Sequence, residues 1–510
     1  MRSITRAFGV ALVSGTLVVS GSLANAQPAE IDAVPVGSID WKPCPEDPTG
    51  ECGSLKLPID YANPAGEKFD LAVARRKATD PAKRLGVMLV NPGGPGGSGV
   101  SYALFKNWPE EIKSRFDIIG WDPRGVARSA PVRCSLDLER AAPSRYPRNQ
   151  AEFDALAKFN RDLLADCRKR SGAITDHADT GATIQDMDSI RRALGEKKIN
   201  YYGVSYGTLM GQQYAERYGD KIRAMVIDSN MDHSLGTWAF AATEAATAED
   251  SFNEWVKWCD RTTSCVLHDK GAARVWDSVL ARADRGELTD PDDPTVKLTA
   301  RNVIQASFGA FYGPSWAPLA EFIAALDAEK PLGTKAFADQ EVNDVFQAAF
   351  CSDWSLPVRS FAEYQAVATA ENAIAPHMRG GALGHTAYTG CIGLPTKVNN
   401  PQHRLNIRHA PKILMLNAIH DPATAYAWAA NAHNQTRDTT VFLTYEGWGH
   451  GVYGRSDCVN TAVNTYFATL KTPAPGTRCA AVEPPTAATL AAGPSALPSG
   501  PLPGVPGWTR

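Results

Sequence analysis

The stretch from Tyr201 to Gly219 reads YYGVSYGTLMGQQYAERYG and contains the pattern Gly-x-Ser-x-Gly, with Ser205 at its centre. The residues before Ser205 suit a buried strand, and residues 208–218 have the spacing of a helix. A sharp turn between strand and helix leaves little room for side chains two positions from its centre, so glycines suit both places. The pattern predicts a strained serine at such a turn, although a chain with 42 glycines can also produce it by chance.

Other short apolar runs are also typical of strands. They cover residues 69–75, 86–91, 117–122, 200–204, 224–228, 412–417 and 440–444. Runs such as GVMLVN and AMVIDS do not alternate between apolar and polar residues, which is typical of parallel strands that are buried on both faces. Because helical patterns separate many of these runs, the sequence predicts an α/β fold with a mostly parallel sheet.

The alternation of strands and helices breaks in residues 232–408, where the pattern is mainly helical. The strand pattern resumes at Lys412, so we interpret residues 27–231 and 409–480 as one α/β domain that carries a helical insertion. Two independent domains in tandem are the alternative. Residues 481–510 are rich in Ala, Pro and Gly, and we expect them to be a flexible tail.

The first residues are typical of a secretory signal peptide. Arg2 and Arg6 give a basic start, an apolar run follows, and Ala24-Asn25-Ala26 is a cleavage site of the A-x-A type. The apolar run is too short to cross about 30 Å of hydrocarbon, which argues against a membrane anchor. We therefore expect residues 1–26 to be removed and the protein to be secreted, without stable membrane insertion.

The charge balance argues against a nucleic-acid partner. The chain has 52 basic and 55 acidic residues, and loss of Arg2 and Arg6 with the signal peptide leaves 50 basic residues and a net charge of −5. A surface that binds nucleic acid needs an excess of positive charge.

All ten cysteines follow the signal peptide, and an even number in an exported chain suggests disulfides. A metal site would need closely spaced pairs of the C-x-x-C type, and the sequence has none, so we expect no metal. Connectivity does not follow from sequence alone. Our prediction joins sequence neighbours: Cys44–Cys52, Cys134–Cys167, Cys259–Cys265, Cys351–Cys391 and Cys458–Cys479.

Two later segments supply chemical partners for Ser205. A serine hydroxyl needs a histidine to take its proton and a carboxylate to orient that histidine. KILMLNAIHDPAT places Asp421 after a late strand, and TTVFLTYEGWGHGVYG places His450 in a loop after the last strand. Each residue alone has an ordinary structural explanation, such as a turn at Asp-Pro, but here the order and the flanks agree. His420 is the rival base, and we interpret it as a neighbour of Asp421.

The reaction also needs donors for a developing oxyanion. One is normally the backbone N–H after the nucleophile, here that of Tyr206. The second comes from the loop after an early strand, which here is NPGGPGGSG, residues 91–99. A phosphate loop is the competing interpretation, but the segment lacks the Lys-Ser/Thr of a P-loop and the spacing of a dinucleotide site.

Five segments carry a resemblance to a known family. NPGGPGGSG, GWDPRGVARS, GVSYG, HDPAT and GWGHG resemble the tripeptidyl aminopeptidase branch of the prolyl-aminopeptidase-like α/β-hydrolases, exported serine exopeptidases of actinobacterial type. The resemblance covers about residues 41–479. It implies an α/β-hydrolase core with a helical cap before the catalytic acid. It also implies a triad of Ser205, Asp421 and His450, and oxyanion donors at Tyr206 and Gly94, with Gly93 as the alternative. Four of the five predicted disulfides fit the family pattern, and Cys259–Cys265 looks like an addition.

An exopeptidase of this kind must hold the free amine of its substrate, and a carboxylate at the closed end of the pocket can do so. We predict that Asp353 and Trp354, in the segment CSDW of the insertion, bind substrate. Other acids of the insertion could serve instead, namely Glu244, Glu249 and Asp250.

The predicted function is release of short peptides or residues from peptides with a free N-terminus, through an acyl-enzyme on Ser205 and without a cofactor. A carboxylesterase or amidase with the same triad is the first alternative, and a non-catalytic binding protein on a hydrolase scaffold is the second. We expect Thr424 to support the acid loop and Arg124 to brace loops rather than contact substrate.

Overall fold

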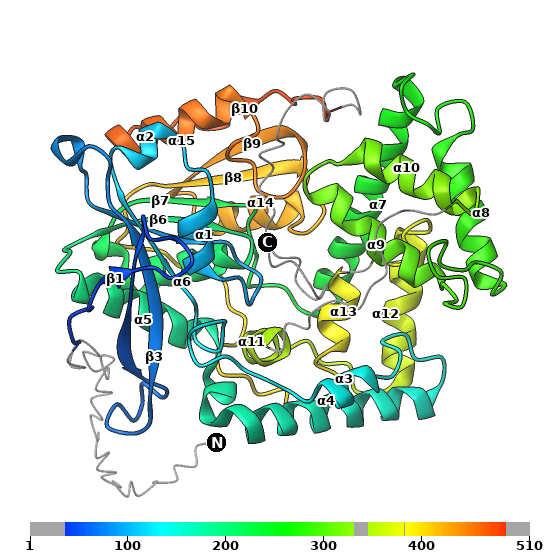
Figure 1. Ribbon diagram of the computed structural model, residues 1–510, viewed down its shortest axis with the longest axis horizontal. Helices are drawn as coiled ribbons and strands as arrows, with labels where there is room; N and C mark the ends of the chain where they lie inside the picture. Colours follow the sequence, from blue (N-terminus) through cyan, green and yellow to red (C-terminus); the bar gives the residue numbers. More distant parts are fainter. Residues whose placement is uncertain (1–35, 331–344, 382, 486–510) are drawn as a thin grey trace, which may run out of the picture. The chain divides into compact units, whose positions relative to one another are not determined.

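In the computed structural model, which describes residues 36–330, 345–381 and 383–485, the strands form one ten-stranded sheet (Figure 1). The strand order is β1-β2-β3-β5-β4-β6-β7-β8-β9-β10. Pairs β1–β2, β2–β3 and β3–β5 are antiparallel, and every other pair is parallel. The predicted signal peptide and most of the predicted tail lie outside the described residues. The strands are β1 (Lys42–Pro43), β2 (Glu51–Pro58), β3 (Lys68–Arg76), β4 (Val87–Asn91), β5 (Asp117–Trp121), β6 (Ile199–Val204), β7 (Ile222–Asp228), β8 (Ile413–His420), β9 (Thr440–Trp448) and β10 (Arg478–Cys479).

The central strands are covered on both faces, as their apolar runs predicted. Every residue of β4, β5 and β6 is buried. Along β4, Val87 and Leu89 pack into one hydrophobic cluster, whereas Met88 and Val90 pack into another. Because successive side chains of a strand point to opposite faces, these two clusters lie on the two sides of the sheet. The prediction of a mostly parallel α/β sheet is confirmed.

Three strands at the two edges of the sheet were not predicted: β1, β2 and β10. β2 has the sequence ECGSLKLP, in which a Gly, a Ser, a Lys and a terminal Pro weaken the strand pattern. Its backbone pairs with β3 over its whole length, so tertiary pairing decides its conformation. β1 and β10 have two residues each, too few for a periodic signal.

The helices flank the sheet and fill the long connection between β7 and β8. In the described part of that connection the only strand-like pairing is an isolated bridge between Thr289 and Lys297. The helices are α1 (Gly99–Phe105), α2 (Glu110–Lys113), α3 (Leu136–Arg140), α4 (Gln150–Ser171), α5 (Thr180–Ala193), α6 (Tyr206–Tyr218), α7 (Thr237–Arg261), α8 (Ala272–Asp284), α9 (Ala300–Tyr312), α10 (Trp316–Asp327), α11 (Val345–Asp353), α12 (Phe361–Ile374), α13 (Leu383–Thr389), α14 (Tyr426–Gln435) and α15 (Asp457–Thr469).

The inserted helices have a hydrophobic core of their own. Trp255, Trp276 and Trp316 are buried in a cluster drawn mainly from α7, α8, α9 and α10, which gather at one side of the sheet in Figure 1. Two residues near the ends of strands β8 and β9 join the same cluster, Ala423 and Trp448. The helical insertion therefore packs directly on the two loops in which the sequence placed a catalytic acid and a catalytic base.

All ten cysteines form disulfides, and the pairing of sequence neighbours is confirmed. The bonds are Cys44–Cys52, Cys134–Cys167, Cys259–Cys265, Cys351–Cys391 and Cys458–Cys479. Cys351 belongs to α11 and Cys391 follows α13, so one disulfide ties together two helices of the insertion.

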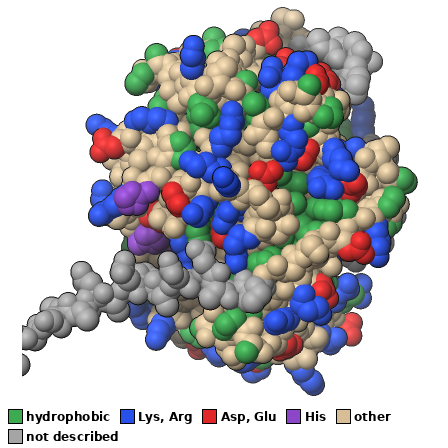
Figure 2. All heavy atoms as spheres, turned by 90° about the vertical axis from the view of Figure 1, so that its left-hand side faces the viewer, with side chains coloured by type: hydrophobic (Ala, Val, Ile, Leu, Met, Phe, Trp, Pro, Cys, Tyr) green, Lys and Arg blue, Asp and Glu red, His purple; other side chains and the backbone are tan. Residues whose placement is uncertain are grey.

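Lys and Arg side chains are scattered over the face shown in Figure 2, with Asp and Glu side chains among them. None of the described helices combines the length and the apolar character that crossing a membrane requires.

Candidate active site

Ser205 lies at the turn between β6 and α6. Its backbone has φ 58° and ψ −126°, which is strained for a residue with a side chain. The Ser205 N–H donates to the carbonyl of Asp228 at 3.1 Å, and the Thr208 hydroxyl donates to the Ser205 carbonyl at 2.6 Å. The sharp turn predicted from Gly-x-Ser-x-Gly is therefore present, and neighbouring strands and the helix hold it in place.

The two glycines of the motif are required by close backbone approaches. A Cβ atom on Gly203 would lie 2.6 Å from the carbonyl oxygen of Gly207. A Cβ atom on Gly207 would lie 2.9 Å from the carbonyl oxygen of Asn91, at the end of β4. Any side chain at either position would push apart β4, β6 and α6, so the glycines are explained by packing at the turn.

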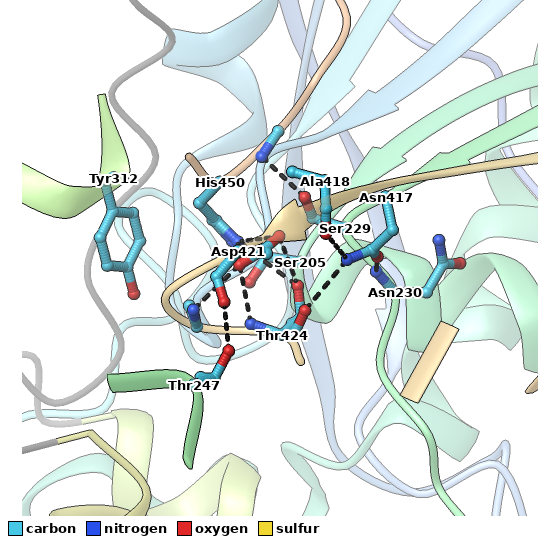
Figure 3. A network of polar contacts seen from close by, with 12 residues as sticks. Ser205, Ser229, Asn230, Thr247, Tyr312, Asn417, Ala418, Asp421, Thr424 and His450 are labelled. Carbon is cyan, nitrogen blue, oxygen red and sulfur yellow. Dashed lines mark hydrogen bonds and ion pairs between the residues drawn. The ribbon is translucent and has the colours of Figure 1, made fainter. Parts of the chain in front are cut away.

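Asp421 and His450 meet at the ends of β8 and β9. His450 Nδ1 lies 2.9 Å from Asp421 Oδ1 and 3.2 Å from Oδ2, and both residues are buried (Figure 3). Ser205 is drawn beside this pair in Figure 3. The contact leaves His450 Nε2 as the nitrogen free to take a proton, because Nδ1 is engaged by the carboxylate.

The Asp421 carboxylate is fixed by several donors. Oδ1 accepts the N–H groups of Ala423 and Thr424, each at 2.9 Å, and Oδ2 accepts the Thr424 hydroxyl at 3.0 Å. Burial alone would raise the pKa of Asp421. The charge of His450 and hydrogen bonds from His450, Ser229 and Thr424 outweigh burial, so the pKa lies below its ordinary value. The carboxylate is thus held ionised, and Thr424 supports it as expected.

His450 Nε2 is buried and has no hydrogen-bond partner among the described residues. Its backbone N–H donates to the carbonyl of Tyr312, whose ring packs edge-on against the imidazole at 4.9 Å. Catalytic hydrogen bonds are often long before substrate binds, so the absence of a bond to Ser205 Oγ fits a resting site. The imidazole is oriented from one side by Asp421 and from the other by α9.

The glycine-rich loop after β4 lies over the turn at Ser205. A Cβ atom on Gly93 would lie 2.8 Å from both the Ser205 Cβ and the Tyr206 N. The Gly93 N–H is already used, since it donates to Asn91 Oδ1 at 2.8 Å. Gly94 lines the cavity beside Ser205 and Tyr206, and no bond of its N–H to another described residue is seen. Tyr206 is the first residue of α6, so its N–H has no acceptor within the helix.

Ser205 opens into a small, mostly apolar cavity of about 30 Å³. Its walls come from the sheet core and from α7, α11, α13 and α14: Gly94, Pro95, Ser205, Tyr206, Met231, Phe240, Glu244, Phe346, Phe350, Leu383, Ala387, Ala423, Thr424 and Trp428. Glu244 is the one carboxylate among these described residues, and no Lys or Arg lines the cavity with it. Burial, with smaller contributions from the charges of Asp421 and Glu371, raises the pKa of Glu244 well above its ordinary value.

The structure does not bring Asp353 and Trp354, which the sequence predicted to bind substrate, to the cavity at Ser205. The Asp353 carboxylate is fully buried and accepts hydrogen bonds from the Thr180 N–H and hydroxyl, the Tyr206 hydroxyl and the Asn400 amide. Burial raises the pKa of Asp353 to about 7. With both oxygens engaged by these donors, the Asp353 carboxylate holds the Tyr206 side chain, so this geometry does not favour Asp353 as the ligand of a substrate amine.

The other candidate acids of the insertion are also engaged elsewhere. Glu249 bonds the His377 ring at 2.5 Å and the Met378 N–H at 3.1 Å. Asp250 bonds the His420 ring at 2.8 Å, so His420 faces α7 rather than Asp421. Asp250, Glu254 and His420 form the one described group close enough to hold a metal ion. These side chains are bonded to each other, to Lys257 and to Trp448, and we assign them no ligand.

Arg124 is buried and pairs with Asp186 through two bonds of 2.8 Å, while its Nη1 donates to backbone carbonyls. It braces loops, as expected. Residues that sequence reasoning missed include Thr247, whose hydroxyl donates to the Asp421 carbonyl at 2.6 Å, and Tyr312. Both come from inserted helices, and no local sequence pattern says which helical face meets the catalytic loops.

Comparison with known proteins agrees with this architecture. Residues 86–294 match the model of the alpha/beta hydrolase fold, and residues 377–479 match that of the TAP-like proteins. Serine protease Hip1 of Mycobacterium tuberculosis is 29% identical over 514 residues, which are 93% of this chain and 96% of the relative. Carboxylesterase B of the same organism is 30% identical, over 85% of this chain and 86% of the relative.

A third relative decides the family. The tripeptidyl aminopeptidase of Streptomyces lividans is 31% identical over 477 residues, which are 87% of this chain and 86% of the relative. Identity of this level over most of both chains, together with the sheet order and the serine turn, leaves no room for a chance match. The chain belongs to the α/β-hydrolase family, in the branch of the tripeptidyl aminopeptidases.

Proposed function

We propose that this serine hydrolase is an exported exopeptidase that releases short N-terminal fragments from peptides with a free amine. Membership in the family gives the class, a serine hydrolase of exopeptidase type. The observation that carries the finer proposal is Glu244, a buried carboxyl that faces the same cavity as Ser205 without a cationic partner there.

The proposed reaction uses Ser205 as the nucleophile. His450 Nε2 takes the Ser205 proton as Oγ attacks the scissile carbonyl carbon, and Asp421 stabilises the imidazolium that forms. The N–H groups of Tyr206 and Gly94 donate to the oxyanion. His450 then gives its proton to the leaving amine as the C–N bond breaks. Water attacks the acyl-enzyme with His450 as base, and the released acid leaves Ser205 free.

Glu244 replaces Asp353 as the proposed ligand of the substrate amine. A carboxyl in an apolar cavity is costly to ionise unless a cation arrives, and an ammonium group supplies that cation. Phe240 and Trp428 stack beside it with centroids 5.3 Å apart, and aromatic faces also favour ammonium groups. A peptide with a blocked N-terminus would bring no charge to Glu244 and would bind more weakly.

The Glu244→Gln variant tests this role. We expect kcat/KM for a free-amine peptide anilide to fall by about 10- to 100-fold, the size of a lost charge-assisted hydrogen bond. The value for the N-acetylated anilide should change little. A carboxyl whose pKa is raised by folding opposes stability above its unfolded pKa of about 4.3, so the variant should also melt higher at neutral pH.

Glu249→Gln is the matched control, since Glu249 lies on the same helix but is bonded to His377 and does not line the cavity. Its ratio of free-amine to acetylated rates should equal that of the wild type. If the wild type itself cleaves both anilides equally well, the aminopeptidase proposal is wrong. An esterase activity would then be the better proposal, and it would agree with the carboxylesterase relative and with the mostly apolar cavity.

Export is part of the proposal. Five disulfides support export, because such bonds persist in oxidising compartments rather than in a reducing cytoplasm. The signal-peptide pattern in residues 1–26 supports secretion. N-terminal sequencing of the protein from culture medium tests it, and a mature chain that begins near Gln27 is the expected result.

A further inference from the structure

The turn that follows β7 touches all three catalytic segments. It begins at Asp228, the last residue of β7, and continues through Ser229 and Asn230, and all three residues are fully buried. The Asp228 carbonyl accepts the N–H of Ser205, so this turn holds the backbone of the nucleophile.

The Asp228 carboxylate hydrogen-bonds the backbone of the loop that carries His450. Oδ1 and Oδ2 accept the Val452 N–H at 2.9 and 3.0 Å, and Oδ2 accepts the Tyr453 N–H at 2.9 Å. The Tyr202 hydroxyl, from the strand that leads to Ser205, also donates to Oδ2, at 3.0 Å. All of these partners are donors, and donors favour the ionised form of a carboxyl. The residues held lie two and three positions after His450.

The next two residues reach both the base and the acid. The Ser229 hydroxyl accepts the Gly451 N–H at 2.7 Å and hydrogen-bonds the Asp421 carboxylate (Figure 3). The Asn230 N–H donates to Asn417 Oδ1 at 2.7 Å. The Asn417 amide in turn donates to the Thr424 carbonyl at 3.1 Å, in the loop of the acid.

The charge of Asp228 acts on His450. Burial raises the pKa of Asp228 above its ordinary value, and the Tyr453, Val452 and Tyr202 donors and the charge of His450 offset only part of that effect. Since the attraction between the two charges is mutual, an ionised Asp228 stabilises a positive charge on the His450 ring. The other charged or titratable groups around the pair are Asp421, Glu244, Arg455, Lys106, Tyr102, Tyr202, Tyr312 and Tyr453.

We propose that Asp228 is a positioning residue of the triad and a second anion behind His450. Its carboxylate fixes the loop that carries the imidazole, and its negative charge joins that of Asp421 in stabilising the imidazolium formed when Ser205 loses its proton. The inference rests on the proposed triad of Ser205, Asp421 and His450. A purely structural carboxylate would hold the loop but would not change how the imidazole titrates.

The Asp228→Asn variant separates these roles. The amide keeps the size of the side chain and removes the charge. We expect kcat to fall about tenfold with KM nearly unchanged, because the charge acts on the imidazolium rather than on bound substrate. In the pH profile of kcat/KM, the fall on the acid side (the acid limb) should move to lower pH by roughly half a unit. The reason is that loss of the anion disfavours the protonated imidazole.

Asp122→Asn is the matched control. Asp122 is also fully buried at the end of a strand, and it accepts the Val100 and Arg128 N–H groups. Its variant should leave the acid limb in place, whatever its effect on stability. If Asp228→Asn has its acid limb at the same pH as the wild type, Asp228 is only structural and the proposal is wrong.

Tyr202→Phe keeps the proposal testable if Asp228→Asn does not fold. This variant removes one donor to the carboxylate, so Asp228 takes up a proton at higher pH. The ratio of variant to wild-type kcat should then fall steadily as the pH is lowered, and a constant ratio would contradict the proposal. Labelling with a fluorophosphonate separates the two levels of inference. A wild type that is not labelled on Ser205 refutes the triad itself, whereas a labelled wild type with unshifted variants refutes only the role of Asp228.

Discussion

Replacement of Ser205 by alanine is expected to lower kcat for a free-amine peptide anilide by about 100,000-fold while the fold is kept. The proposed reaction forms a covalent bond to Ser205 Oγ, and the His450 Nε2 that is proposed to take its proton is buried without another partner among the described residues. The activity that remains would come from the oxyanion donors and from substrate binding alone. Steady-state kinetics with an active-site titration of the wild type measure the effect.

The matched control for this variant is Ser307→Ala. Ser307 is a buried serine of α9 whose hydroxyl donates to the Val303 carbonyl, and it does not line the cavity at Ser205. Its variant should keep wild-type kcat. Residual activity in Ser205→Ala above about one hundredth of the wild type would show that another group attacks the substrate.

Gly93→Ala is expected to lower kcat by about 100- to 1,000-fold, the usual cost of losing an oxyanion donor. The added Cβ would lie 2.4 Å from the Val204 carbonyl oxygen and 2.8 Å from the Tyr206 N. Contacts this short force the loop away from Ser205 and carry the Gly94 N–H out of line. KM should change less than kcat, because the oxyanion exists only in the transition state and the tetrahedral intermediate.

Gly93 also has a positive φ of 87°, which costs any other residue some stability. Gly271→Ala controls for that effect. Gly271 has a φ of 77°, and the nearest atom to its added Cβ lies 3.9 Å away. We expect Gly271→Ala to lower the melting temperature without changing kcat. If Gly93→Ala loses only stability and keeps its kcat, the loop does not supply the oxyanion donor.

The sequence was sufficient to predict the central strands of the sheet, because the patterns that indicate them are local. A strand that is buried on both faces is apolar over most of its length, and β4 to β7 show this pattern in short, well-separated runs. The turn at Ser205 depends on glycines two residues away on either side. Edge strand β2 lacked such a signal, because its conformation depends on pairing with β3.

The substrate side of the site could not be predicted in the same way. Asp353 looked favourable because it adjoins Trp354, but its carboxylate faces Tyr206 and Thr180. Glu244 faces the cavity because Gly384 of α13 packs against its side chain, where a Cβ atom would lie 2.4 Å from the Glu244 Cβ. Contacts between helices of the insertion decide which acid faces Ser205, and periodicity within one helix does not contain that information.

The turn after β7 was missed for a related reason. The segment VIDSN has the pattern of the end of a buried strand. No feature of this segment predicts that the Asp228 side chain hydrogen-bonds residues 452 and 453. These contacts join parts of the chain more than two hundred positions apart, and they exist only once β7, β8 and β9 lie side by side. The candidate catalytic residues each stand in a sequence motif, whereas the residues that contact and position them carry no motif.

Product analysis of matched peptides tests the central claim most directly. The protein is incubated with a short peptide that has a free N-terminus and with its N-acetylated twin, and products and enzyme are followed by mass spectrometry. The account predicts fragments released from the free N-terminus, an acyl group trapped on the tryptic peptide that contains Ser205, and little cleavage of the acetylated twin. Equal cleavage of the twin, or cuts within the interior of either peptide, would contradict it.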